Sequence, residues 1–134
     1  MSETGRLHIL YVDDDRDIRQ IVKMSLALDP AIELRMCADG IEALLAVTTD
    51  GWQPDLVLLD VMMPRMDGPA LMAALRGNPD FADTPFIFVT ARAREADVKA
   101  YHAAGAAGVI LKPFDPLTLA RSVRAMMRDG RKAP

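Results

Sequence analysis

The chain has 134 residues, of which 51% are hydrophobic and 26% charged, and its formal net charge is −3. This composition is that of a folded globular domain and argues against intrinsic disorder. The length fits one domain with a single sizeable core. The acidic balance, with a pI near 5.3, does not favour nucleic-acid binding, which usually calls for a basic patch. With one cysteine, Cys37, no disulfide can form within the chain.

The sequence shows neither the apolar run of a membrane span nor the pattern of an N-terminal signal peptide. No apolar run approaches the length of a membrane span, and the polar residues 1–5 lack the apolar core of a signal peptide. We therefore expect a cytoplasmic protein without a membrane partner. We also expect one domain over residues 1–134, with a core from about 7 to 128 and short tails at 1–5 and 130–134.

Strand-like and helix-like segments alternate along the whole chain. Short apolar runs predict strands over 7–12, 32–37, 56–60, 86–89 and 108–111. The run at 32–37 alternates apolar and polar residues, which is typical of an edge strand exposed on one side. Helical periodicity predicts helices over 16–28, 39–49, 69–76 and 95–104, and a last helix that opens at Asp115 and Pro116 and ends before residue 130. Gly105 is expected at the C-terminal cap of the fourth helix.

Five strand–helix units in sequence predict a doubly wound α/β fold, with a parallel sheet and helices on both faces. Right-handed crossovers leave few topologies, and the strand order expected for five strands is 2-1-3-4-5. In such a sheet, ligands bind in the crevice at the carboxyl ends of the strands. The residues that follow each strand are therefore the candidates for function.

Charged and hydroxyl side chains stand at four of these strand ends. Asp60 follows the apolar run 56–59, and a carboxylate buried there alone would be costly. Asp13 and Asp14 follow the first strand, Thr90 the fourth, and Lys112 the fifth. Clustered carboxylates raise one another's pKa unless a cation is present. An oxygen-only set without histidine or cysteine suits a hard cation such as Mg²⁺.

Taken one at a time, most of these residues have ordinary structural explanations. Asp15 is expected to be a helix N-cap rather than a ligand. Asp13 and Asp14 are equally well explained as acids favoured near a helix N-terminus. Thr90 would be a strand-end threonine. The argument for a site is the joint pattern, because all of these positions fall at one edge of the predicted sheet.

Four segments in order resemble the receiver domain of two-component response regulators. They are residues 9–15, which include Asp13-Asp14-Asp15, residues 56–68 around Asp60, residues 88–91 around Thr90, and residues 105–114 around Lys112-Pro113. The resemblance covers about 7–128. It implies the flavodoxin-like (βα)5 fold already expected from the alternation.

The resemblance also implies a metal site. Asp14 would bind Mg²⁺ directly, and Asp13 would act mainly through water. Asp60 and the backbone carbonyl of Met62 would complete the protein ligands. Mn²⁺ is expected to substitute for Mg²⁺.

The resemblance further implies that Asp60 accepts a phosphoryl group from a phosphohistidine. Thr90 would hydrogen-bond that group, and Lys112 would pair with Asp60 at rest and with the phosphoryl group afterwards. The Lys112–Pro113 peptide bond would be cis, which an X-Pro bond permits. A carboxylate is already ionised near neutral pH, so no general base is required.

These roles imply a phosphorylation-activated switch rather than an enzyme, one that catalyses only its own Mg²⁺-dependent phosphorylation and dephosphorylation. The phosphodonor would be a sensor histidine kinase or a histidine phosphotransfer protein. A downstream protein would bind the face formed by the fourth helix, the fifth strand and the fifth helix. No direct nucleic-acid contact is expected, and the chain would be a monomer or a weak phosphorylation-dependent dimer.

Several alternatives remain open from the sequence. The chain is expected to be a stand-alone regulator; a receiver fragment of a larger regulator and a phosphate-sink receiver are the alternatives. A haloacid dehalogenase-like phosphatase would need a second aspartate where Met62 stands. A flavodoxin-like nucleotide or flavin module would need a phosphate-binding loop where the aspartates of the first strand end stand.

One position departs from the family pattern. Where the family usually carries an aromatic residue, this chain has Val109, whose stiff side chain has no ring to move. We expect Val98 and His102, four apart on one helix face, to help form the output surface with it. Met62 and Arg92, each two residues after a site residue, are expected to border the phosphoryl group and to slow its hydrolysis.

Overall fold

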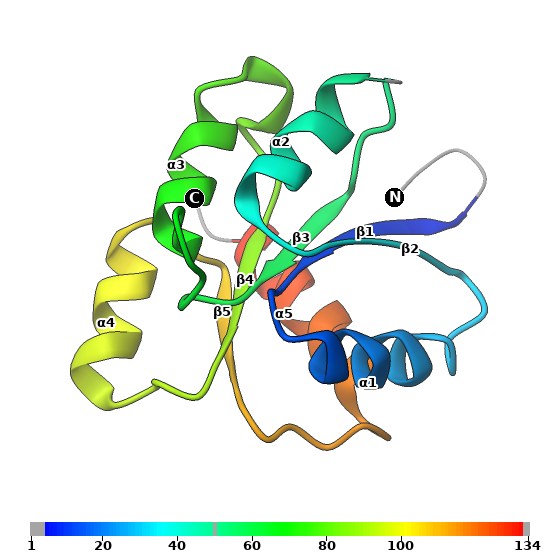
Figure 1. Cartoon of the computed structure of the whole chain (residues 1–134). Coiled ribbons are helices and arrows are strands. Elements are labelled where there is room, and N and C mark those ends of the chain that lie inside the picture. Colours follow the sequence, from blue (N-terminus) through cyan, green and yellow to red (C-terminus); the bar gives the residue numbers. More distant parts are fainter. Residues whose placement is uncertain (1–4, 50, 133–134) are drawn as a thin grey trace.

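A computed structural model of the chain describes residues 5–49 and 51–132, with side chains described as far as residue 129. Residues 1–4 of the predicted N-terminal tail lie outside the described residues. Five parallel strands form one sheet in the order β2-β1-β3-β4-β5 (Figure 1). The predicted fold class and strand order are therefore confirmed.

The strands lie close to where the sequence predicts them. They are β1 (Leu7–Val12), β2 (Ile32–Cys37), β3 (Leu56–Leu59), β4 (Phe86–Thr90) and β5 (Gly108–Leu111). β2 is an edge strand. As predicted, its apolar residues are half-buried or, at Cys37, buried, and its polar residues Glu33 and Arg35 are exposed. The inner strands β3 and β4 are buried at every position, because helices cover both faces of a parallel sheet.

The helices are α1 (Arg16–Leu26), α2 (Gly40–Thr49), α3 (Gly68–Arg76), α4 (Glu95–Ala103) and α5 (Leu119–Lys132), with a 3₁₀ turn η1 (Pro79–Phe81) that the sequence did not predict. α1 ends two residues earlier than expected. The N–H groups of Leu28 and Asp29 donate to carbonyls three residues back, so the chain leaves the α-helix in tight turns. α4 ends in a cap at which Gly105 has a φ of 114°, as expected for a C-terminal glycine. No helix among the described residues has both the length and the hydropathy to cross a bilayer.

The predicted start and end of the last helix were wrong. The Asp115 side chain accepts a hydrogen bond from the Leu117 N–H at 2.9 Å, and its carbonyl accepts one from the Thr118 N–H at 3.1 Å. These bonds close a turn over 115–118 rather than the first turn of a helix, and Leu117 is exposed. α5 then continues to Lys132, so residues 130–132 of the predicted tail are helical, and residues 133–134 lie outside the described residues.

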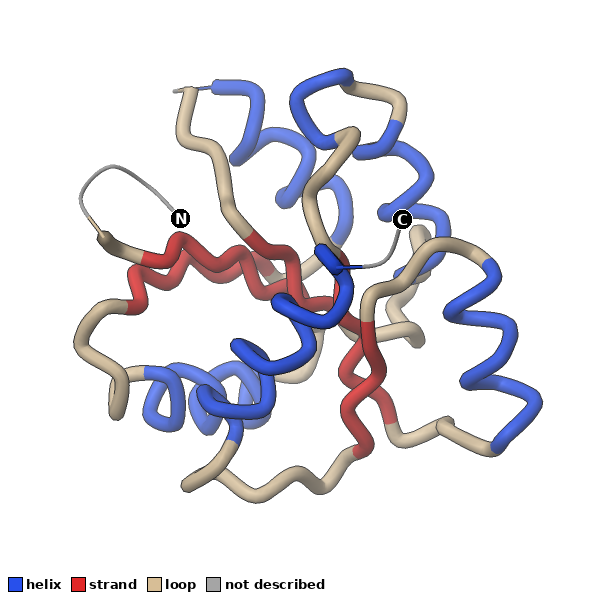
Figure 2. The backbone as a smooth tube through the Cα atoms, turned by 180° about the vertical axis from the view of Figure 1, so that it is seen from behind, coloured by secondary structure: helices blue, strands red, loops and turns tan. Residues whose placement is uncertain are grey.

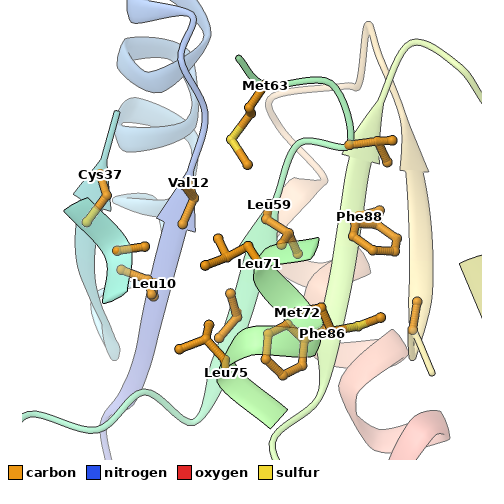
Figure 3. Packing of buried hydrophobic residues seen from close by; sticks show 14 of the residues in the cluster. Leu10, Val12, Cys37, Leu59, Met63, Leu71, Met72, Leu75, Phe86 and Phe88 are labelled. Atoms are coloured by element: carbon orange, nitrogen blue, oxygen red, sulfur yellow. The ribbon is translucent and has the colours of Figure 1, made fainter. Parts of the chain in front are cut away.

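Helices lie on both faces of the sheet (Figure 2). The buried side chains between the sheet and these helices form two separate cores. The first, here called the α1–α5 core, contains Leu7, Ile9, Tyr11, Val22, Leu26, Leu56, Leu58, Ile87, Val89, Ile110, Leu119, Val123 and Met127. The second, the α2–α4 core, contains Leu10, Val12, Cys37, Ala43, Val47, Val57, Leu59, Val61, Met63, Leu71, Met72, Leu75, Phe81, Phe86, Phe88, Tyr101 and Ala106 (Figure 3). In the inner strands β3 and β4, successive apolar residues alternate between the two cores.

The register of the strands brings the predicted site residues to one edge. Val12 pairs with Leu59, and the Asp60 N–H donates to the Val12 carbonyl at 3.0 Å. At the ends of the paired strands β4 and β5, the Lys112 N–H donates to the Thr90 carbonyl at 2.9 Å. Main-chain hydrogen bonds between the strands therefore set the spacing of the Asp60, Thr90 and Lys112 side chains.

Candidate functional site

Three carboxylates meet at the carboxyl edge of the sheet. Asp13, Asp14 and Asp60 each offer one oxygen, and the three oxygens lie within 4.8 Å of one another. Asp13 is fully buried and Asp60 is 8% exposed, whereas Asp14 is exposed. This arrangement, with oxygen donors alone and one open side, fits a hard divalent cation that keeps several waters. The predicted grouping of these residues agrees with the structure.

Asp15 does not join this group. Its side chain accepts hydrogen bonds from the N–H groups of Asp17 at 2.9 Å and Ile18 at 3.2 Å, as the N-cap of α1. The predicted N-cap is confirmed.

Lys112 supplies the positive charge of the site. Its ammonium lies 2.8 Å from Asp13 Oδ2 and 3.1 Å from Asp60 Oδ2. The pairing with Asp60 was expected, but the shorter contact with Asp13 was not. The peptide bond that follows, Lys112–Pro113, is cis, as predicted. Because Lys112 bridges two strand ends, it offsets the repulsion between two carboxylates that burial would otherwise strengthen.

The pKa values of Asp60 and Lys112 are both raised, but for different reasons. Burial raises the pKa of Asp60; the hydrogen bond from Lys112 opposes this effect, and the charge of Asp13 adds to it. Burial alone would lower the pKa of Lys112, but its hydrogen bonds to Asp13 and Asp60 and their charges outweigh burial and raise that pKa. Lys112 therefore keeps its proton and its positive charge. The negative charge of the Asp60 carboxylate is only partly compensated.

A pocket of about 350 Å³ opens beside Asp60, and its lining includes both Thr90 and Lys112. Thr90 is buried, and its hydroxyl oxygen accepts a hydrogen bond from the Arg92 N–H at 3.0 Å. The remaining lining residues are Met62, Ala91 and Arg92. The predicted placement of Met62 and Arg92 at the border of this space therefore agrees with the structure.

The loop after β3 approaches Asp60 closely. The Met62 N–H donates to Asp60 Oδ1 at 3.2 Å, while the Met62 side chain is 57% exposed. The Gly68 N–H returns to the Val61 carbonyl at 2.9 Å. A β-carbon at Gly68 would overlap the backbone carbonyl oxygen of Asp60. The Met62 N–H and the Lys112 ammonium therefore bind different oxygens of the Asp60 carboxylate.

Two tyrosines that the sequence analysis passed over contact this region. The Tyr11 hydroxyl donates to Asp13 Oδ2 at 2.6 Å, and the Tyr101 hydroxyl donates to the Arg92 carbonyl at 3.0 Å. Burial, followed by the charge and hydrogen bond of Asp13, raises the pKa of Tyr11, so the phenol keeps its proton. For Tyr11 a signal was present: it lies two residues before Asp13 in a strand, so both point to the same face.

The raised pKa of Asp60 leads to a prediction about stability without divalent cations. A carboxyl group whose pKa is higher in the folded than in the unfolded state destabilises the folded state when it is ionised. This cost disappears as the pH falls through the folded pKa towards 3.8, the ordinary pKa of an aspartate. Asp60→Asn removes the charge, so we expect a higher Tm than wild type at pH 7. The gain should shrink as the pH approaches 4. Thermal unfolding followed by circular dichroism across this pH range measures both effects.

The matched control is Asp29→Asn. The hydrogen bond from Arg124 lowers the pKa of Asp29, so this variant should be less stable than wild type at pH 7, with the loss shrinking as pH falls. An Asp60→Asn protein that melts below wild type at pH 7 would contradict the assignment of a net burial cost to Asp60.

Comparisons with known proteins agree with this geometry. Residues 9–124 match the response regulator receiver domain. The chain is 38% identical over 122 residues to the response regulator MprA of Mycobacterium tuberculosis, covering 91% of this chain and 51% of that protein. The MprA of Mycobacterium leprae gives the same identity and coverage. The chain thus spans about half the length of these relatives.

Solved structures give the same result at the level of the fold. The chemotaxis response regulator CheY4 of Vibrio cholerae superimposes with a TM-score of 0.81 at 31% identity, over 90% of this chain and 98% of that one. The signal receiver domain of a histidine kinase from Syntrophus aciditrophicus gives a TM-score of 0.75 at 29% identity, over 95% and 94%. This chain belongs to the response regulator receiver domain family of two-component systems.

Proposed function

We propose that the chain is a phosphorylation-controlled switch in which Asp60 is the phosphoacceptor. Receiver domains are signalling domains that interact with histidine kinases and downstream effectors, and they bind Mg²⁺ at an acidic pocket. The observation that carries the proposal is the position of the Asp60 carboxylate. It lies within hydrogen-bond reach of Lys112 and the Met62 N–H, beside a pocket that Thr90 also lines.

The donor set supports a divalent cation at Asp13, Asp14 and Asp60. Three carboxylates and the single ammonium of Lys112 leave two negative charges, which one divalent cation balances. Asp13 Oδ2 already accepts two donors, and Oδ1 accepts the Asp15 N–H at 2.9 Å. This favours contact of Asp13 with the cation through water, and direct contact for exposed Asp14. A Mg²⁺ ion at this site would neutralise negative charge on the transferred group. Mn²⁺ would take the same place.

In the proposed reaction, a carboxylate oxygen of Asp60 attacks the phosphorus of a phosphohistidine. The new P–O bond forms as the P–N bond breaks, and the imidazole leaves with the electron pair. Such transfer depends on alignment and charge compensation more than on proton transfer. Lys112 and the Thr90 hydroxyl would stabilise the phosphoryl oxygens, because both border the pocket in which that group would lie.

Incubation with acetyl phosphate and Mg²⁺ tests the phosphoacceptor directly. Intact-protein mass spectrometry should show one phosphoryl group on the wild type, none on Asp60→Asn, and none after EDTA. Thr90→Ala and Lys112→Ala should reduce the yield. The control is Asp15→Asn, which removes a neighbouring carboxylate but keeps a residue suited to an N-cap. Equal labelling of the wild type and Asp60→Asn would refute the proposal.

We propose that Met62 shields the acyl phosphate from water. Its side chain borders the pocket and reaches solvent, so an attacking water must pass it or Arg92. Met62→Asn should shorten the lifetime of the phosphorylated protein several-fold, on the order of 1 kcal/mol in the barrier. The decay of the labelled protein after removal of the donor measures this. Met24→Asn, at an exposed methionine of α1, should decay as the wild type does; an unchanged rate for Met62→Asn counts against shielding.

The output surface is proposed to be the face of α4, β5 and α5. Val98 is half-buried and His102 is exposed on α4, and Val109 packs at the border of the α2–α4 core that contains Tyr101. Val109 has no ring, but the Tyr101 ring lies 5.2 Å from that of Phe88, in an edge-on arrangement. A hydrogen-bonded path then runs from Thr90 through the Arg92 backbone to Tyr101 and α4.

We propose that this path carries the signal to α4, with Tyr101 in place of an aromatic residue on β5. Tyr101→Phe keeps the ring but loses the hydroxyl bond to the Arg92 carbonyl. Phosphorylation of Asp60 should stay within about twofold of wild type, because no site residue is lost. The changes in amide chemical shift of Val98 and His102 on adding beryllofluoride with Mg²⁺ should become smaller. Shift changes equal to those of wild type would eliminate Tyr101 from the path.

The domain boundaries and partners of the full protein remain proposals, because the chain matches about half of its mycobacterial relatives. A stand-alone regulator, a phosphate sink and the receiver part of a longer regulator all use the same chemistry at Asp60. A phosphate sink differs from the other two because no downstream protein binds its phosphorylated form. A pull-down with and without beryllofluoride separates a sink, which should capture no phosphorylation-dependent partner, from the other two.

A further inference from the structure

The only polar atom of Tyr11's side chain is directed at the acidic cluster from inside the α1–α5 core. Tyr11 is fully buried, and its hydroxyl donates to Asp13 Oδ2 at 2.6 Å. The same oxygen accepts a hydrogen bond from Lys112 at 2.8 Å. A buried phenol in a strand usually needs a partner, but here the partner is the carboxylate that also holds the site's lysine.

Lys112 is shared between two carboxylates. Its ammonium lies 2.8 Å from Asp13 and 3.1 Å from Asp60. In the proposed reaction this ammonium must turn towards a phosphoryl group on Asp60, which weakens or breaks its bond to Asp13. Asp13 is fully buried, and a buried carboxylate oxygen left without a donor is costly. The hydrogen bond to Asp13 would therefore keep Lys112 from turning towards the phosphoryl group, unless another donor to Asp13 Oδ2 remained.

We propose that Tyr11 is a positioning residue that keeps Asp13 hydrogen-bonded and so frees Lys112 to follow the phosphoryl group. Packing in the α1–α5 core fixes the ring, so the hydroxyl stays beside Asp13 Oδ2 whether or not Lys112 is there. The Asp15 N–H holds the other oxygen at 2.9 Å. This inference rests on the proposed function of Asp60 and adds a residue that acts on Lys112 through Asp13.

The test compares wild type, Tyr11→Phe and Tyr101→Phe in two binding measurements on the whole chain. Mg²⁺ alone is titrated by calorimetry, and beryllofluoride is titrated at saturating Mg²⁺ by fluorine NMR. Tyr101→Phe is the matched control, because it also removes a tyrosine hydroxyl bond near the site but leaves Asp13 untouched.

We expect Tyr11→Phe to bind Mg²⁺ as wild type does, within about threefold, but to bind beryllofluoride about tenfold more weakly. Tenfold is the effect of one hydrogen bond to a charged group. Tyr101→Phe should match wild type in Mg²⁺ binding and stay within about twofold of wild type in beryllofluoride binding, because its hydroxyl acts on the loop after Thr90 and not on Asp13. Equal weakening of Mg²⁺ and beryllofluoride binding in Tyr11→Phe would mean that Tyr11 only holds Asp13 in place, and no weakening would mean that it only packs; either result overturns the proposal.

A second measurement serves if Tyr11→Phe does not fold. In the wild type, the hydroxyl proton of Tyr11 should remain slowly exchanging in proton NMR after beryllofluoride is added, because its bond to Asp13 persists. Loss of that signal on beryllofluoride binding would overturn the proposal. A wild type that binds no beryllofluoride at all would instead refute the proposed function of Asp60, so the two failures are distinguishable.

Discussion

The site depends on one ammonium shared by two buried carboxylates. Lys112 lies within 2.8 Å of Asp13 and 3.1 Å of Asp60, and it comes from a strand end far from both in the sequence. Without this cation, two acids on adjacent strands would repel each other in a poorly solvated environment. With it, the cluster still lacks positive charge. The resting site is thus stable enough to fold and remains attractive to a divalent cation.

The geometry of that charge cluster is set by the backbone. Asp13 and Asp60 are neighbours because β1 and β3 pair in register up to Val12 and Leu59. Thr90 and Lys112 are neighbours because β4 and β5 do the same. Hydrogen bonds of a parallel ladder are evenly spaced and leave little freedom at the strand ends. Burial of β3 and β4 on both faces holds this edge rigid, which suits a reaction that relies on alignment.

Much of this could be predicted from the sequence, because strand ends are local signals. Apolar runs followed by Asp60, Thr90 or Lys112 place these residues at an edge once the strand order is known. The start of α5 was mispredicted because Asp115 and Pro116 are favoured both in turns and at helix N-termini. The spacing of Tyr11 and Asp13 places both on one face of β1, but spacing alone does not predict the hydrogen bond between them. The bond from Tyr101 to the Arg92 carbonyl was missed because no spacing in the sequence indicates it. The closer contact of Lys112 with Asp13 than with Asp60 likewise depends on distances in the folded chain, which the sequence does not give.

The division of the hydrophobic interior into two cores has a consequence for how such a protein diversifies. Tyr11 belongs to the α1–α5 core and Tyr101 to the α2–α4 core, yet both donate hydrogen bonds to groups at the same edge of the sheet. Substitutions on one face can adjust the resting charge cluster, and substitutions on the other can adjust the loop after Thr90, without shared packing between them. The sheet thus acts as a partition across which two properties can drift separately during evolution.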